Sequence, residues 1–160
     1  MSVKVMGIDP GTFKMGIGLI ERKKDTLEAL FYKTVTINRK LSLHKKLQRI
    51  QNEALHIFET WQPDVVALED VFFGVSFKSA IRIGEARCSV ILAAMQQNIA
   101  VFEYPPTRVK NAVCGFGRAA KIQVQSMVKQ ILHLKELPPP DAADALALAI
   151  CHINNMCVTR

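Results

Sequence analysis

The sequence predicts an α/β domain in which a mixed five-stranded sheet is flanked by helices. Three observations lead to this fold class: strand-like segments open the chain, helical and strand-like segments then alternate, and 49% of the 160 residues are apolar. A meander followed by alternating elements is typical of a mixed sheet with helices on its faces. We expect a single domain over residues 1–160, which is long enough to bury its own core.

The strands are predicted from short apolar runs bounded by turn residues. Residues 3–9, 15–21 and 27–37 are expected to form an antiparallel meander, with Pro10-Gly11 at the first turn and the polar segment 22–25 at the second. Two further strands are expected at residues 64–69 and 100–104, and Pro105-Pro106 ends the last of them.

Helices are predicted between and after these strands. Apolar side chains recur at helical spacing from about residue 42 to residue 61, and Pro63 follows as a stop signal. Further helices are expected over residues 76–97, 107–113 and 119–134, and over 141–154 after three consecutive prolines. Residues from about 155 to 160 are expected to form a flexible tail.

The helix predicted at residues 76–97 is apolar on more than one side. One stripe consists of Phe77, Ala80, Gly84, Cys88, Ile91 and Met95, while Ile83, Ala86, Val90 and Ala93 lie off it. Such a helix needs a second partner to bury it. Either the same chain covers both sides or the stripe is the interface of a two-fold homodimer, and in so small a domain we prefer the homodimer.

The charge of the chain favours an anionic partner. Lys and Arg outnumber Asp and Glu by 21 to 14, giving a net charge of +7, which suits nucleic acid, although a basic protein without such a partner has the same composition. The stretch 105–135 has no acidic residue and carries six basic ones: Arg108, Lys110, Arg118, Lys121, Lys129 and Lys135. This polarity predicts a face that meets a polyanion.

The location expected from the sequence is the cytoplasm, without membrane contact. The first residues lead directly into a strand and do not resemble a signal peptide. No apolar run approaches the roughly 20 residues that span a bilayer. The four cysteines form no C-x-x-C pair, which gives no support to a zinc or redox site.

Four acidic residues are predicted to meet in one cleft: Asp9, Glu69, Asp141 and Asp144. Asp9 and Glu69 each end a strand, and their side chains share a cleft if those strands are parallel neighbours. Asp141 and Asp144 are three residues apart, so they share one face of a helix, and the alanines at 142, 143, 145, 147 and 149 would let that helix lie close to the sheet.

The four acids together favour a metal site, although some have a purely structural explanation. Asp141 and Asp144 can cap a helix, and Asp9 can be a turn residue, whereas Glu69 closing an apolar strand is costly without a partner. Carboxylates in one cleft repel each other without a cation, and their hard oxygens suit Mg²⁺, with Mn²⁺ as a substitute. Two such ions roughly 4 Å apart would drive phosphodiester hydrolysis, and Lys110 or Lys121 would neutralise transition-state charge.

Several motifs, in order along the chain, resemble those of the bacterial RuvC family of Holliday-junction resolvases. They are Gly7-Ile8-Asp9-Pro10-Gly11-Thr12, Leu68-Glu69-Asp70-Val71-Phe72, Glu85-Ala86-Arg87, Val101-Phe102-Glu103-Tyr104, Gln123-Val124-Gln125 and Asp141-Ala142-Ala143-Asp144-Ala145-Leu146-Ala147. The resemblance runs from about residue 5 to residue 153. It implies a ribonuclease H-like fold, a homodimer, Mg²⁺, and paired symmetric nicks in a four-way DNA junction during recombination and repair.

The resemblance also implies roles for individual residues. The catalytic acids of the family match Asp9, Glu69, Asp141 and Asp144, its essential lysines match Lys110 and Lys121, and its junction-stacking aromatic residue matches Phe72. Phe73, Arg108 and Arg118 are further DNA-binding candidates, although Phe73 is also a plausible core residue. Cooperation with the branch-migration proteins RuvA and RuvB is implied. Asp70 replaces an amide of some relatives, and we expect it to point away from the metals because neighbouring strand residues face opposite sides.

Three other functions remain open on the sequence alone. The segment 7–12 also resembles the phosphate-binding turn of actin-like ATPases, but those proteins close two such domains around a nucleotide. A YqgF-type nuclease is usually shorter and has a different final motif. A non-catalytic junction-binding protein would have no use for four buried acids, which are costly to keep.

Overall fold

The computed structural model describes residues 2–24, 26–70 and 76–158, and these form a mixed five-stranded sheet with the order β3-β2-β1-β4-β5. Its strands are β1 (Ser2–Asp9), β2 (Lys14–Lys23), β3 (Thr26–Thr36), β4 (Val65–Glu69) and β5 (Ala100–Tyr104). β1, β2 and β3 pair antiparallel, whereas β4 pairs parallel with both β1 and β5. The predicted meander and mixed sheet are confirmed.

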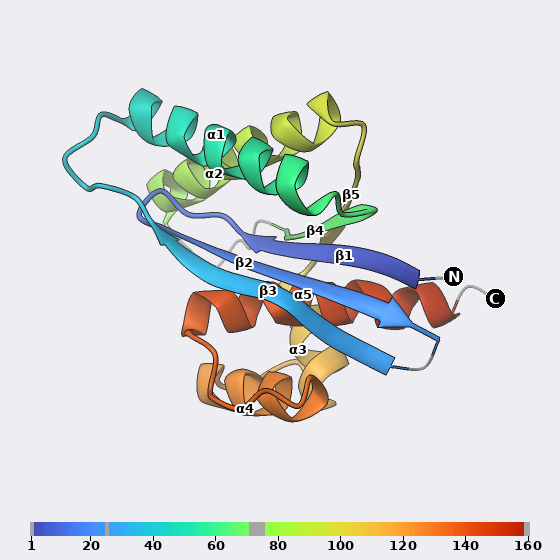
Figure 1. The fold of residues 1–160 in the computed structure, drawn as a ribbon. Helices are drawn as coiled ribbons and strands as arrows, with labels where there is room; N and C mark the ends of the chain where they lie inside the picture. Colours follow the sequence, from blue (N-terminus) through green and yellow to red (C-terminus); the bar gives the residue numbers. More distant parts are fainter. Residues whose placement is uncertain (1, 25, 71–75, 159–160) are drawn as a thin grey trace.

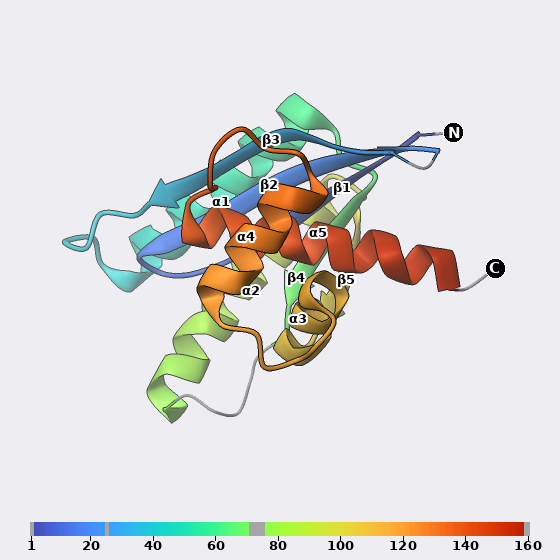
Figure 2. The same cartoon turned by 90° about the horizontal axis from the view of Figure 1, so that it is seen from below.

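Helices cover both faces of the sheet (Figure 1). On one face lie α1 (Leu43–Trp61) and α2 (Phe77–Gln96). On the other, α5 (Pro140–Val158) crosses the sheet, and α3 (Pro106–Cys114) and α4 (Lys121–Ile131) pack outside α5 (Figure 2). α5 continues to Val158, four residues past the end predicted for the last helix at residue 154. No helix in the described ranges is long and apolar enough to cross a membrane.

Two apolar cores fill the spaces between these layers. Side chains alternate along each strand, so neighbouring residues enter different cores. In β1, Met6 and Ile8 belong to the core under α1 and α2, whereas Val5 belongs to the core under α5. The alternation fixes which face each strand-end residue points toward.

Three glycines let α5 approach the backbone of the sheet closely. Gly7 and Gly18 are cross-strand partners in β1 and β2, and Gly16 lies two residues before Gly18. A Cβ atom at Gly7 would stand 1.8 Å from the Ala145 carbonyl oxygen, and one at Gly16 would stand 1.9 Å from the Asp141 carbonyl oxygen. We call Gly7, Gly16 and Gly18 the glycine patch. With the fully buried alanines of α5, it confirms the expected close packing of this helix.

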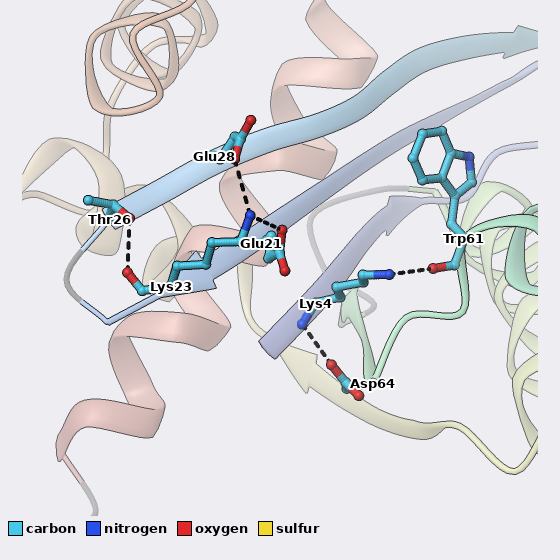
Figure 3. Close-up of polar contacts among 7 residues, drawn as sticks. All are labelled: Lys4, Glu21, Lys23, Thr26, Glu28, Trp61 and Asp64. Carbon is cyan, nitrogen blue, oxygen red and sulfur yellow. Dashed lines mark hydrogen bonds and ion pairs between the residues drawn. The ribbon is translucent and has the colours of Figure 1, made fainter. Parts of the chain in front are cut away.

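Polar contacts hold the register of β1 and β4 at the end of the sheet where β1 begins. The Lys4 amide donates to Asp64 Oδ2 at 2.7 Å, the Asp64 amide donates to the Lys4 carbonyl at 2.9 Å, and Lys4 Nζ donates to the Trp61 carbonyl (Figure 3). These bonds join the end of α1 and the start of β4 to β1. They therefore help to align the other ends of β1 and β4, which lie side by side.

Candidate active site

Asp9 and Glu69 lie at the carboxyl ends of two adjacent parallel strands. Ile8 pairs with Leu68 in the parallel register, so the two acids are the next residues of their strands. Both alternate with residues of the core under α1 and α2, and both therefore point toward α5. The parallel arrangement on which the sequence argument depended is confirmed.

Asp141 and Asp144 reach the same place from the first turns of α5. Gly16 is the cross-strand partner of Asp9, and the Asp141 carbonyl lies against the Cα of this glycine. The contact places the start of α5 over the end of β1. Asp9, Glu69, Asp141 and Asp144, which we call the acid cluster, are all partly buried.

The acid cluster is coupled electrostatically. Burial and the negative charges of Glu69, Asp144 and Asp141 raise the pKa of Asp9 from 3.8 to about 7. Burial and Asp144 likewise raise the pKa of Glu69. Burial raises the pKa of Asp144 too, with a further contribution from Asp141. Acids that oppose one another's ionisation in this way form a site that favours a bound cation.

The two predicted lysines lie beside the acid cluster. Lys121 Nζ is 3.6 Å from Asp144 Oδ2, and its charge lowers the pKa of Asp9, Glu69 and Asp144 against the other influences. Lys110 lowers the pKa of Glu69 and Asp144. Lys121 stands at the first residue of α4 and Lys110 on α3, so the two outer helices bring positive charge to the acids. A third lysine that the sequence argument did not single out, Lys14, is 3.9 Å from Asp141.

The other predicted DNA-binding residues do not gather with the acid cluster in the same way. Arg108 lies over the Tyr104 ring, 5.8 Å from its centroid, and donates to the Asn155 side chain. Arg118 is exposed on the segment between α3 and α4. Phe72 and Phe73 lie outside the residues that the structure describes.

Asp70 faces away from the acid cluster, as its place after Glu69 predicts. Its carboxylate is 3.9 Å from the Arg87 guanidinium of α2, which also pairs with Glu103 of β5. Its amide donates to the Tyr104 carbonyl at 2.9 Å. Arg87 therefore ties α2 to the ends of β4 and β5, immediately behind Glu69. The sequence shows Arg87 only as part of a motif, because its partners are distant along the chain.

The donor set suits a hard divalent cation, although the side chains do not form a finished cage. No three His, Cys, Asp or Glu side chains within residues 2–24, 26–70 and 76–158 stand close enough together to hold a metal ion. The acid cluster offers only carboxylate oxygens, the ligands that Mg²⁺ and Mn²⁺ prefer. Burial and repulsion by the other acids raise the pKa of Asp9, and a bound cation would offset both effects.

Comparison with known proteins identifies the family. The family model described as "Crossover junction endodeoxyribonuclease RuvC" matches residues 5–152. The chain belongs to the RuvC family. It is 44% identical over 153 residues to a RuvC from Caldicellulosiruptor saccharolyticus, covering 94% of this chain and 92% of that protein. It is also 44% identical over 152 residues to the Thermotoga maritima RuvC, covering 94% and 90%.

A solved RuvC structure extends the similarity to three dimensions. The structure titled "T. thermophilus RuvC in complex with Holliday junction substrate" matches with a TM-score of 0.91 and 34% identity, over 98% of this chain and 96% of that one. The mixed sheet with helices on both faces is therefore the ribonuclease H-like fold of RuvC resolvases, as the motifs implied.

Proposed function

We propose that this RuvC-family chain is a Mg²⁺-dependent endonuclease that resolves Holliday junctions by paired symmetric nicks in recombination and repair. The observation that carries this proposal is the acid cluster: four carboxylates come from three separate segments, and burial together with their charges raises the pKa of Asp9 to about 7. Idle acids in this arrangement would only destabilise the fold. The chain also resembles, at 34% identity, a RuvC solved with a Holliday junction.

In the proposed site, Asp9, Glu69, Asp141 and Asp144 hold the metal. When bound, the divalent ions supply Lewis acidity and neutralise charge on the phosphate. Asp9 would be the central ligand, because it ends a rigid strand and is coupled to all three other acids. Lys121 and Lys110 approach from α4 and α3, where they offset negative charge on the acids and on a phosphate undergoing attack.

A two-fold homodimer fits the exposed side of α2. The helix buries Ala86, Val90 and Ala93 against its own sheet. Part of the predicted stripe faces outward: Phe77 is 83% exposed, Met95 is 51% exposed, and Cys88 is exposed as well, whereas Ile91 packs against the core of its own chain. Apolar side chains in this number on one helix favour a second copy as the partner. Two copies would present two identical sites to a junction that has near two-fold symmetry.

The cellular setting is also part of the proposal. Residues 1–160 act as one nuclease domain in the cytoplasm, in cooperation with RuvA and RuvB, as membership of the family implies. Phe72, with Phe73, Arg108 and Arg118, is proposed to contact junction DNA.

The direct test uses a synthetic four-way junction and a matching duplex, each with and without Mg²⁺. We expect symmetric nicks in the junction alone, and only with the metal. Asp9→Asn should abolish cutting but keep junction binding, because the substitution removes a ligand and preserves the shape of the side chain. Glu28→Gln, at an exposed acid of the outer strand β3, is the control and should still cut. Equal loss of binding and cutting in Asp9→Asn would show a structural role instead.

A further inference from the structure

A second basic feature lies beside the acid cluster, outside the residues discussed so far. A cleft of about 620 Å³ is bounded by the turn between β1 and β2, the start of α1 and the first turns of α2. Its walls include five cationic side chains and no acidic one: Lys14, Arg39, Lys46, Lys78 and Arg82. We call this space the basic cleft. Its cations come from four separate segments, so the sequence shows no continuous basic run there.

Three of these cations lack an anionic partner in the described part of the chain. Lys14 pairs with Asp141, and Arg82 pairs with Glu85 at 2.8 Å. Arg39, Lys46 and Lys78 form no ion pair with any acid that the structure describes. Positive charge collected in a concave space without counter-charge favours an anion from outside.

Lys46 is the cation of the basic cleft that most favours an anionic partner. This lysine is only 9% exposed, and burying an ammonium group is costly without a partner. Its Nζ lies 4.7 Å from the centroid of the Phe13 ring, and the Arg39 guanidinium lies 5.3 Å from the same ring. The two positive charges lie near the same ring and repel each other. Cation–π attraction to the ring offsets this repulsion only in part. The backbone of Phe13 is held in place, because its carbonyl accepts the Ile37 amide at 2.9 Å.

The basic cleft and the acid cluster are linked by the turn between β1 and β2. Gly11, Phe13 and Lys14 line the cleft and follow Asp9 directly in the chain. Lys14 Nζ stands between the two features, 3.9 Å from Asp141 Oδ2. Lys14 therefore brings the cleft next to the acids.

We infer that the basic cleft binds the phosphodiester backbone of the strand being cut, immediately beside the scissile phosphate. The inference rests on the proposed function. Arg39, Lys46 and Lys78 contact phosphate oxygens, while the apolar walls at Leu43 and Ile83 accept sugars. Contacts of this kind set the position of the strand and carry no base sequence.

The test measures how junction affinity depends on salt, in an Asp9→Asn background that binds without cutting. Arg39→Gln/Lys78→Gln removes two exposed cations with little risk to the fold. The slope of log affinity against log salt should become less steep by about one for each cation removed. Ethylation interference at phosphates next to the cut should disappear in this variant. The matched control Lys23→Gln/Lys24→Gln removes two exposed cations at the turn between β2 and β3 and should leave the slope unchanged.

The outcomes separate this inference from the proposed function. An unchanged slope in Arg39→Gln/Lys78→Gln, or an equal change of slope in the control pair, would show that the basic cleft does not bind the strand. The proposed function would be unaffected as long as the unmodified protein cuts the junction. Absence of junction cutting by the unmodified protein overturns the proposed function itself. Lys46→Gln should also reduce the slope and Lys46→Arg should restore it, and thermal melting checks that both remain folded.

Discussion

The two faces of the sheet are packed by different means. Toward α5, the glycine patch brings helix backbone against strand backbone, with carbonyl oxygens where side chains would otherwise stand. Toward α1 and α2, large side chains such as Ile8, Ile17 and Phe58 fill the space. Large side chains can rearrange when one of them changes, whereas touching backbones cannot. The face with the acid cluster is therefore built for accurate position and the other face for burial.

The largest effect is expected for Gly16→Ala, which disturbs the close packing of α5 on the sheet. The new Cβ would stand 1.9 Å from the Asp141 carbonyl oxygen, so α5 must move away from Asp9. We expect a loss of more than about 3 kcal/mol in the free energy of unfolding, together with the loss of junction cutting. Urea unfolding and the cutting assay measure the two effects.

The matched control is Ile17→Val, the next residue, which points to the opposite face. Removing one methyl group there should cost about 1 kcal/mol and leave cutting intact. Equal costs for the two substitutions would show that the faces do not differ as we describe.

A second experiment tests how ionisation of Asp9 affects the stability of the α5 face. Because the pKa of Asp9 is raised from 3.8 to about 7 in the folded protein, the native state holds a proton that the unfolded state has released. In metal-free buffer, stability should therefore fall as the pH rises from 3.8 to about 7. Asp9→Asn should remove much of this fall and be more stable above that range, by on the order of a few kcal/mol.

Thermal melting across pH measures this effect, with and without Mg²⁺. Added Mg²⁺ should stabilise the unmodified protein more than Asp9→Asn, because a ligand that binds only the native state raises its stability. Identical pH profiles for the two proteins would contradict the assigned cause of the shifted pKa.

A smaller effect is expected at the β5 edge of the same face. The Tyr104 hydroxyl is 2.8 Å from His152 Nδ1 of α5, and both side chains are buried. Burial lowers the pKa of His152, which therefore stays neutral in the fold. Tyr104→Phe would leave this ring nitrogen without its partner, at a cost of about 1–3 kcal/mol. Urea unfolding tests this, and Tyr32→Phe, which is only partly buried, should change stability less.

The smallest effect on stability is expected for Lys121→Ala. The side chain is 75% exposed, so the free energy of unfolding should change by less than about 0.5 kcal/mol. Cutting should nevertheless weaken. Lys121 lowers the pKa of Asp9, Glu69 and Asp144, so without it these acids should ionise, and cutting should set in, at a higher pH. Lys129→Ala provides the control on α4. A melting temperature that drops as far as that of Ile17→Val would count against this assignment.

Much of this fold could be predicted, because its signals are local. Apolar runs and turn residues located every strand, and the spacing of Asp141 and Asp144 placed two acids on one helix face. The end of α5 was predicted too early because Asn154 and Asn155 are poor helix formers. In the structure, the Asn155 side chain is held by Arg108 and by the Cys151 carbonyl.

The features that could not be predicted depend on contacts between distant segments. Nothing near Arg87 indicates that it pairs with Asp70 and Glu103, and nothing near Lys46 indicates that it lies against Phe13. The glycine patch had a signal, since Gly16 and Gly18 alternate as residues on one strand face do. That spacing becomes informative only when the alanines of α5 are considered with it.

The acid cluster depends on the position of α5 on the sheet. Asp9 and Glu69 belong to the sheet, while Asp141 and Asp144 travel with the helix. If α5 moves away from the glycine patch, Asp141 and Asp144 separate from Asp9 and Glu69. The proposed metal site is then lost, even if the strands stay paired. In such a protein, hydrolytic competence would vanish ahead of global melting, so a loosened molecule would hold DNA without severing it.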